Sequence, residues 1–277
     1  MLKQKLLNQT ADGNADTAVP SSRLSFLSYQ FDVIAHLVVR NFLLRYRGSA
    51  LGVLWSLLVP LSQLLVLTFI FVKVVSLKIE AYPAFLFIGI LPWNWFSTCV
   101  TSAGSLFIQN RDLVLKPNFI PSNLIVVDVF TNLLTFLILL PLLFLLLIVY
   151  QRQVTIYLLM VPLLLLIQSL LITGIGLIIS TLNILYRDIQ HMVNIAVILL
   201  FYLTPIFYRT AMLDKKYHFI YNLNPMAVLV ESYRATFFYG ASPEWGSLLY
   251  VTIISLLTCL AGYKVYQRLL PQIFDHI

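Results

Sequence analysis

Residues 124–150 are LIVVDVFTNLLTFLILLPLLFLLLIVY and residues 154–185 are VTIYLLMVPLLLLIQSLLITGIGLIISTLNIL, with only Gln151, Arg152 and Gln153 between them. A membrane-spanning helix needs about 20 mostly apolar residues, each of which advances it by about 1.5 Å. Both stretches exceed that length, so the sequence predicts a tight hairpin of two membrane helices. The second stretch is too long for an upright helix, and we expect it to tilt or to project beyond the bilayer.

Further apolar stretches on both sides of this hairpin repeat the pattern. The sequence predicts six spans, which are Leu51–Val75, Ala84–Phe107, Leu124–Tyr150, Val154–Leu185, Met192–Tyr208 and Ser247–Tyr266. Only 10% of the 277 residues are charged, whereas water-soluble domains carry about 25%. We therefore expect an all-α integral membrane protein in which residues 51–277 form one domain of six transmembrane helices.

The orientation is predicted from Lys and Arg, which are enriched in cytosolic loops. With the N-terminus inside, eleven of these residues fall on the cytosolic side and seven on the outer side, so we expect both termini in the cytosol. The net charge of +7 is explained by these loops, so we expect no nucleic-acid partner. Residues 1–22 are polar and lack the apolar core of a signal peptide, which predicts a disordered tail and leaves insertion to the first span.

Residues 23–50 form a predicted interfacial helix. Its apolar residues recur at three- and four-residue spacing, at Leu24, Leu27, Phe31, Ile34, Val38 and Phe42. A basic amphipathic helix beside a span suits the anionic inner leaflet, and Arg40, Arg45 and Arg47 are the candidates to bind a phosphate headgroup there. The alternative is a helix that packs on the cytosolic surface of the protein itself.

The inner connection between the second and third spans carries a charged candidate segment. Arg111, Asp112 and Lys116 precede Pro117 and Pro121, which delimit the segment. A short helix here could dock into a groove on a cytosolic partner. A solvated turn is the alternative.

Two more polar features lie near the inner ends of spans. Tyr186, Arg187 and Asp188 follow the fourth span, where they can anchor exposed backbone carbonyls or contact a partner or a substrate phosphate. Asp128 is an acidic residue inside a predicted span, and intramembrane carboxylates are functional candidates. Since no acidic or histidine companion lies nearby, we expect a local polar contact with Asn132, one turn away.

Aromatic residues gather between Phe201 and Trp245, where twelve of 45 residues are Phe, Tyr or Trp. An interfacial aromatic belt accounts for some of them, but aromatic faces also suit the apolar C–H faces of sugar rings. Trp93 and Trp95 lie mid-way through the second span, where they either line a cavity or fill the core. The candidate conduit residues are Trp93, Trp95, Phe201, Tyr202, Phe207, Tyr208, Tyr233 and Phe237.

The same region predicts short re-entrant helices on the outer face between spans five and six. Pro225 to Phe238 can form an amphipathic helix with Asn224 as its N-cap. Glu231 and Arg234 can pair on it at i,i+3 spacing. Such a helix would shape the exit of a pore.

Motifs for chemistry are missing from the sequence. It has no G-x-x-x-x-G-K-[ST] loop for ATP, no H-E-x-x-H and no G-x-S-x-G. Its four histidines are scattered, and its two cysteines fall in apolar stretches, so we expect no metal site and no catalytic residues. A chain of this kind is a conduit rather than an enzyme, and its energy source is expected on another chain.

Four motifs in register resemble the permease subunit of type-2 ATP-binding-cassette exporters, in the branch that exports O-antigen, capsule and teichoic-acid chains. They are Arg45–Ser49 with Leu51–Trp55, Asn183–Asp188, Thr204–Tyr208, and Asn224–Met226 with Glu231, Tyr233, Arg234 and Gly240. The similarity covers roughly residues 24–277. One departure is Asn41, where many relatives carry an acidic residue.

The resemblance implies a homodimer around a central pore, with two cytosolic ATPase subunits beneath it that bind ATP and Mg²⁺, so no cofactor is expected on this chain. Arg111, Asp112 and Lys116 would be the coupling element. A lipid-linked glycan would enter from the inner leaflet of the bacterial inner membrane, with its pyrophosphate near the interfacial helix. The alternatives are a type-2 exporter of drugs or lipids, a membrane enzyme of glycan assembly, and a structural membrane anchor.

Overall fold

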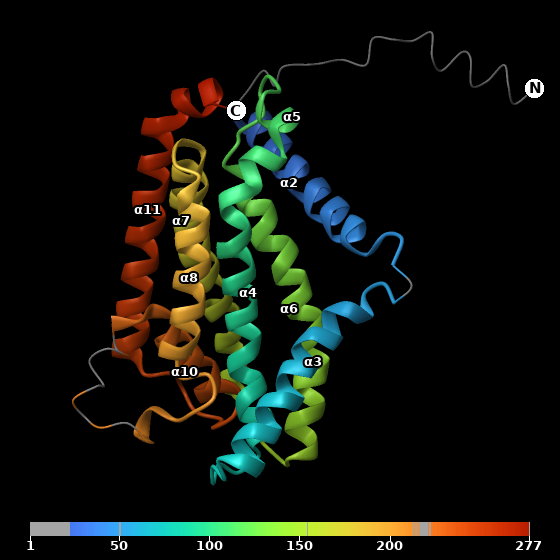
Figure 1. The fold of residues 1–277 in the computed structure, drawn as a ribbon, viewed down its shortest axis with the longest axis vertical. Coiled ribbons are helices and arrows are strands. Elements are labelled where there is room, and N and C mark those ends of the chain that lie inside the picture. The colour runs from blue at the N-terminus through green and yellow to red at the C-terminus, as the bar shows by residue number, and fades with distance from the viewer. Residues whose placement is uncertain are drawn as a thin grey trace, which may run out of the picture.

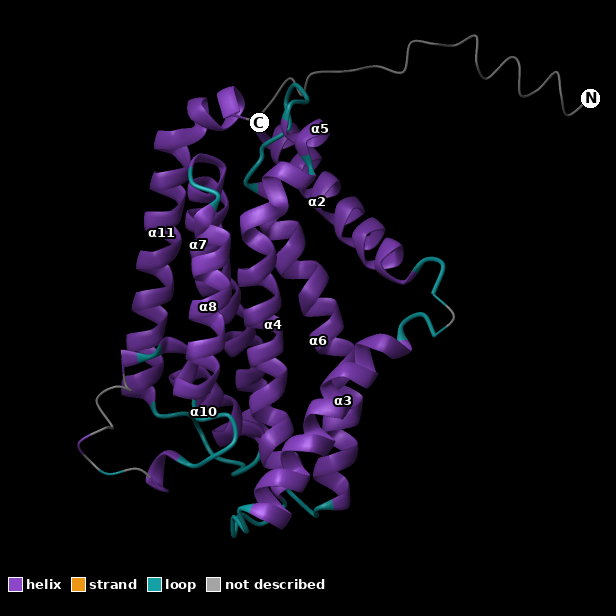
Figure 2. Ribbon diagram, viewed as in Figure 1, coloured by secondary structure: helices purple, strands orange, loops and turns teal. Residues whose placement is uncertain are grey.

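The computed structural model describes residues 23–49, 51–153, 155–212, 214, 216, 221 and 223–276. Helices account for all the regular structure in these residues, which confirms the all-α class (Figure 2). The predicted disordered tail, residues 1–22, lies outside the described residues, as do Ala50, Val154, Tyr217, His218 and Phe219.

The helices follow the predicted order along the chain (Figure 1). They are α2 (Arg23–Tyr46), α3 (Leu54–Thr68) with its π-helical continuation η1 (Phe69–Val74), α4 (Tyr82–Gln109), α5 (Arg111–Val114), α6 (Asn123–Val149), the 3₁₀ helix η2 (Ile156–Met160), α7 (Val161–Leu185), α8 (Asp188–Leu203), the 3₁₀ helix η3 (Thr210–Met212), α10 (Pro225–Phe237) and α11 (Trp245–His276).

Five helices in the described part of the chain are long and apolar enough to cross a membrane, namely Leu54–Val74, Tyr82–Gln109, Asn123–Val149, Ile156–Leu185 and Trp245–Phe274. The predicted count of six is not confirmed, because α8 has only 16 residues. The prediction carried this helix on to Tyr208, but it ends at Leu203. Pro205 explains the difference, since proline has no backbone N–H and disfavours a helical conformation at the residue before it.

α4 is the central helix of the bundle. It packs against α3, α6, α7, α8 and α10, and 78% of its most apolar part is buried, against 11% for α3 with η1. α7 and α11 run side by side along their lengths. α3 therefore lies at an edge of the bundle and offers most of its apolar side chains to lipid or to a partner.

α2 packs along α6 and is held there by polar contacts near its start. Leu37 and Val38 are buried, and the Gln30 side chain accepts a hydrogen bond from the Asn123 amide at 2.6 Å. Phe31, on the predicted apolar face, is 71% exposed, as a side chain that faces lipid would be. The helix is apolar on more than one side, and the Gln30 contact selects the side that docks. Its open side carries exposed apolar residues, so it can pack on the protein and still face lipid.

The link between α2 and α3 turns on two glycines in left-handed backbone conformations. Gly48 has φ of 79° and Gly52 has φ of 50°. Residues with a side chain adopt such φ values at a cost of about 1–2 kcal/mol. The glycines of the predicted entry motif thus turn the chain between the interfacial helix and the first span (Figure 1).

Candidate functional site

The central helix α4 carries a polar face that runs along the bundle. Small hydroxyl and amide side chains recur on it at three- and four-residue spacing, at Asn94, Ser97, Thr98, Thr101, Ser102 and Ser105. This spacing places all of them on one side of a helix. A polar face on a helix at this depth is a candidate wall for a water-filled or ligand-filled path.

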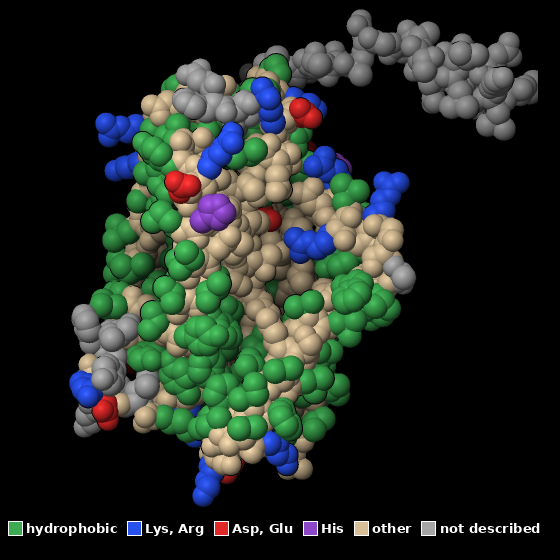
Figure 3. Space-filling view, in the orientation of Figure 1, with side chains coloured by type: hydrophobic (Ala, Val, Ile, Leu, Met, Phe, Trp, Pro, Cys, Tyr) green, Lys and Arg blue, Asp and Glu red, His purple; other side chains and the backbone are tan. Residues whose placement is uncertain are grey.

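Two adjoining hollows follow this polar face, and we call them together the polar groove. They have volumes of about 510 Å³ and 680 Å³ and share Gln63, Asn94, Ser97 and Thr98 in their walls. Figure 3 shows a hollow in the surface between the α2–α3 side and the centre of the molecule. Few of the side chains in this hollow are green, the colour of hydrophobic residues. The Asn94 amide donates to the Gln63 side chain at 2.9 Å, which joins α4 to α3 inside the groove.

A chain of hydrogen bonds closes the end of the groove nearest α2. Arg45 Nη1 donates to Asn132 Oδ1 at 3.0 Å and reaches Thr135 Oγ1 at 3.4 Å. Asn132 donates to Asp128 Oδ1 at 3.2 Å, and the Ser102 hydroxyl donates to Asp128 Oδ2 at 2.7 Å. The predicted local contact of Asp128 with Asn132 is therefore confirmed, and it belongs to a network that connects α2, α6 and α4.

The structure separates the three arginines that were grouped as headgroup candidates. Arg45 faces the polar groove. Arg40 and Arg47 line a different hollow, of about 440 Å³, whose other walls are mainly the apolar residues of α2 and Val53. The sequence placed them together because they lie within eight positions, but a helix turns Arg45 to a different side from the other two.

The candidate conduit aromatics fall into two groups. Tyr202 is 62% exposed and lines the groove with the half-buried Phe201, while Trp93 and Trp95 touch it from the packed core. Tyr233 and Phe237, in contrast, are buried against Phe136 and Phe144 inside the bundle, and Phe207 and Tyr208 lie half-buried at its α10 end. Their burial supports a packing role for Tyr233 and Phe237 within the single chain.

The predicted pair Glu231–Arg234 forms on α10, with Arg234 Nη1 at 2.9 Å from Glu231 Oε1. Asn224 caps this helix by accepting from the Met226 N–H, as its position before Pro225 predicted. Arg234 is fully buried and lies over the Phe85 ring, with its guanidinium carbon 3.7 Å from the ring centre. Burial lowers the pKa of the Arg234 guanidinium, and the Glu231 carboxylate opposes that shift.

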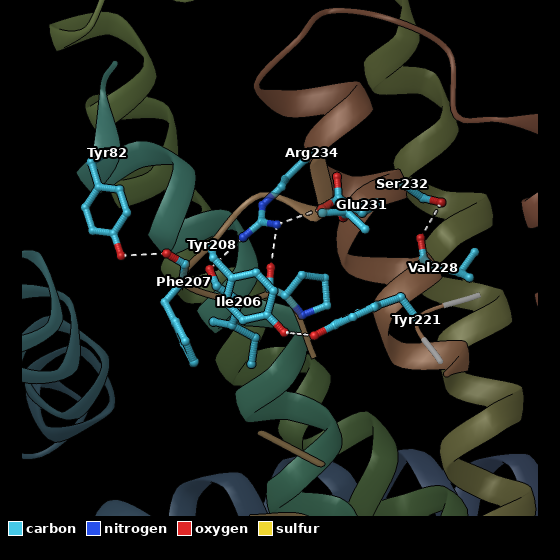
Figure 4. Close-up of polar contacts among 11 residues, drawn as sticks. Tyr82, Ile206, Phe207, Tyr208, Tyr221, Val228, Glu231, Ser232 and Arg234 are labelled. Carbon is cyan, nitrogen blue, oxygen red and sulfur yellow. Dashed lines mark hydrogen bonds and ion pairs between the residues drawn. The ribbon is translucent and has the colours of Figure 1, made fainter. Parts of the chain in front are cut away.

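The Arg234 cluster holds the irregular chain that follows α8 (Figure 4). Arg234 donates to the carbonyl oxygens of Pro205 and Ile206, and Tyr82 donates to that of Phe207 at 2.9 Å. Successive carbonyls that no helix satisfies thus find partners on α10 and α4. Buried backbone groups need such partners, so the Glu231–Arg234 pair shapes the turn after α8. The prediction that α10 is a re-entrant helix is not confirmed.

The candidates on the inner connections lie on the surface. Arg111, Asp112 and Lys116 are exposed on and after α5, and Figure 1 places α5 at the same end of the bundle as the α7–α8 turn. Tyr186, in that turn, is 64% exposed, and Arg187 and Asp188 are exposed beside it.

Asn183, at the start of the same motif, has a structural role. Its side chain donates to the Gly104 carbonyl at 2.8 Å and accepts from the backbone N–H of Gln190 at 2.9 Å. It fixes the α7–α8 turn against α4, and the three exposed residues of the motif remain available to a partner. In the described part of the chain, no group of three or more His, Cys, Asp or Glu side chains is placed to hold a metal ion.

Sequence reasoning did not identify the polar face of α4 or Gln63. The signal was present, because polar residues at i, i+3, i+4, i+7 and i+8 from Asn94 form a stripe. They are small and lie among apolar residues, and they carry neither the charge nor the aromatic ring that distinguishes the other candidates.

The chain matches proteins of known families over most of its length. The model of the ABC-2 type transporter family matches residues 32–238. An O-antigen export system permease protein RfbA of Klebsiella pneumoniae is 32% identical over 245 residues, which cover 88% of this chain and 94% of the relative. An O-antigen export system permease protein RfbA of Myxococcus xanthus is 33% identical, with 86% and 93% covered. The polysialic acid transport protein KpsM of Escherichia coli is 27% identical, with 83% and 91% covered.

Proposed function

The chain belongs to the ABC-2 type transporter family and is a transporter permease rather than an enzyme; on that premise we propose that it is the transmembrane subunit of an ATP-driven exporter of a lipid-linked polysaccharide. The relatives named for O-antigen and polysialic acid support this class of substrate. ATP and Mg²⁺ would bind to a separate ATPase.

The polar groove is the observation that carries the proposal. Its walls combine hydroxyls and amides from α4 and α3 with Trp55, Trp95, Phe201 and Tyr202. Hydroxyls and amides exchange hydrogen bonds with sugar hydroxyls, and aromatic faces cover the apolar C–H faces of the rings. The lining also includes apolar side chains such as Val59, Leu91 and Leu139, so the preference for a glycan over a lipid or an apolar drug rests on the relatives named for O-antigen and polysialic acid.

The groove is open along one side, which favours a homodimer. α3 and α8 flank it, and both expose rows of large apolar residues, among them Leu58, Val59, Ile198 and Leu199. A second copy across these helices would bury the rows and close two grooves into a pore. We propose this arrangement, with two cytosolic ATPases at the end that carries α5.

The exposed charges of the inner connections suit the ATPase contact. Arg111, Asp112 and Lys116 lie on a short segment that directly continues α4, so force applied there reaches the helix that lines the groove. The excess of Lys and Arg on this side supports a cytosolic position for it and for both termini, in the bacterial inner membrane.

Filling the groove tests the proposal. Thr98→Leu and Thr101→Leu remove exposed hydroxyls from the polar face of α4, and Thr252→Leu makes a similar change on α11, away from the groove walls and from α3 and α8. In vesicles that contain the permease with its ATPase, we expect the two groove variants to slow transfer of a lipid-linked glycan while the control does not. Equal transfer rates in all three variants would show that the groove is not part of the transport path.

A further inference from the structure

Arg45 is the one charged residue among those that line the 510 Å³ hollow of the polar groove. We infer that Arg45 forms a binding site for a phosphate ester at this end of the groove, and that Asn132 and Asp128 position its guanidinium. This inference rests on the proposed function and deepens it, since it names the anionic group of the substrate and the place where that group binds.

The guanidinium of Arg45 is only partly occupied. Its Nη1 bonds to Asn132 and Thr135, both of which are neutral acceptors. Among the described residues no carboxylate comes within 4.0 Å of it to form an ion pair, in contrast to Arg152, Lys216 and Arg234. An arginine has five N–H donors in a planar fork that matches two phosphate oxygens, so most of its donors are left for a ligand.

The guanidinium of Arg45 is accessible to a ligand. Arg45 is exposed and lines the hollow. The Asp128 carboxylate is bonded to Asn132 and not to the guanidinium itself. The cavity walls next to it carry Ser49, Ser56, Thr135 and Asn94, so a phosphate at Arg45 would have room and hydrogen-bond partners for an attached sugar.

The support behind Arg45 connects this site to the central helix. Asp128 accepts from Asn132 and from Ser102 of α4, which fixes the Asn132 oxygen towards Arg45. A ligand that draws Arg45 away from Asn132 therefore disturbs a network that ends on α4, the helix that continues into α5. Asn132 and Asp128 are positioning residues in this account, and Arg45 makes the contact with the ligand.

The phosphate can come from a polyprenyl diphosphate or from the headgroup of an anionic phospholipid. The test uses the full chain in nanodiscs of phosphatidylcholine, to which a long-chain polyprenyl diphosphate or phosphatidylglycerol is added, and measures binding of each. Arg45→Gln removes the guanidinium. Asn132→Asp leaves the guanidinium in place but sets a carboxylate against it. Arg40→Gln with Arg47→Gln is the control, because these two arginines line the other hollow.

We expect Arg45→Gln and Asn132→Asp each to weaken binding of the diphosphate lipid by about tenfold or more, the size of a lost charged hydrogen bond, while the control retains it. Retention of the melting temperature by Asn132→Asp shows that the loss is not unfolding. A loss confined to phosphatidylglycerol would support the site but assign it to bulk lipid. Unchanged binding of both lipids to Arg45→Gln, or a loss only in the control, overturns the inference. The binding measurement does not depend on transport, so a failure here leaves the glycan exporter proposal standing.

Discussion

Gly174 of α7 and Gly262 of α11 lie against each other, and neither position has room for a side chain because the backbone of the other helix is too close. A β-carbon on Gly174 would lie 2.5 Å from the backbone nitrogen of Cys259, and one on Gly262 would meet the Gly174 carbonyl. Small residues let membrane helices approach in this way and gain packing energy. The contact joins α11 to the rest of the bundle.

Gly174→Ala and Gly262→Ala should therefore force the two helices apart. Overpacking of this kind costs about 1–3 kcal/mol or more, and we expect a clear fall in the melting temperature in detergent. Gly246→Ala is the matched control, because a β-carbon there meets nothing within 4 Å and alanine favours the helix. Equal melting temperatures for all three variants would contradict the close crossing.

Arg234→Lys should destabilise the turn that follows α8. Lysine keeps the charge but cannot reach the carbonyls of Pro205 and Ile206 together while it lies over Phe85. Each buried carbonyl left without a partner costs about 1–3 kcal/mol. Arg209→Lys is the control, since Arg209 lies 5.8 Å from the centre of the same ring and is half-exposed. The comparison is the melting temperature of the two variants, and an equal loss in both would show that the ring contact alone matters.

Replacement of Asp112 and Lys116 by Ala should weaken binding of the ATPase. Both residues are exposed, Asp112 on α5 and Lys116 just after it, and charge-assisted contacts contribute about 1.5–3 kcal/mol each. The control removes Lys78 and Glu80, an exposed base and acid at the opposite end of α4. Capture of the ATPase by the purified permease is the measurement. If the Asp112 and Lys116 double variant captures as much ATPase as the wild type at every salt concentration, the segment is a solvated turn and not a docking element.

The two groups of aromatic residues should respond differently to truncation. Tyr202→Ala removes an exposed ring in the groove, so export should fall by a modest factor without loss of stability. Tyr233→Ala opens a cavity in the core, which costs about 3–5 kcal/mol, and export should fall in step with the melting temperature. Measurement of both quantities for each variant separates the roles. If Tyr202→Ala loses stability in proportion to its loss of export, Tyr202 has a packing role rather than a role in the groove.

The long helices were predictable because the length of a membrane span depends mainly on the number of consecutive apolar residues. The third span was expected at Leu124–Tyr150 and is found at Asn123–Val149. Local chemistry also predicted the Asn224 cap and the Glu231–Arg234 pair, since both depend on residues within one turn. The last helix was underestimated: it was expected to end at Tyr266 and continues to His276, because polar residues can extend a helix beyond the membrane.

Features that depend on tertiary contacts were not predictable. Helical spacing turns Arg45 away from Arg40, but which of the two sides faces the groove depends on how α2 docks against α6, and that contact is not readable from the residues of α2 alone. The burial of Tyr233 could not be inferred either, since an aromatic residue in a short helix fits an exposed belt, a pore wall or a core. The polar face of α4 was recognisable by spacing, but its depth in the bundle comes from helices on several sides of it.

The most direct test of the central claim is the fate of lipid-linked glycan in cells that lack this chain. The account predicts that polyprenyl-linked glycan accumulates on the cytosolic side, that the surface polysaccharide disappears, and that the wild-type chain restores both while the Thr98→Leu variant restores them poorly. Surface polysaccharide at the normal level, with no internal accumulation in the deletion strain, would contradict the assignment of this permease to polysaccharide export.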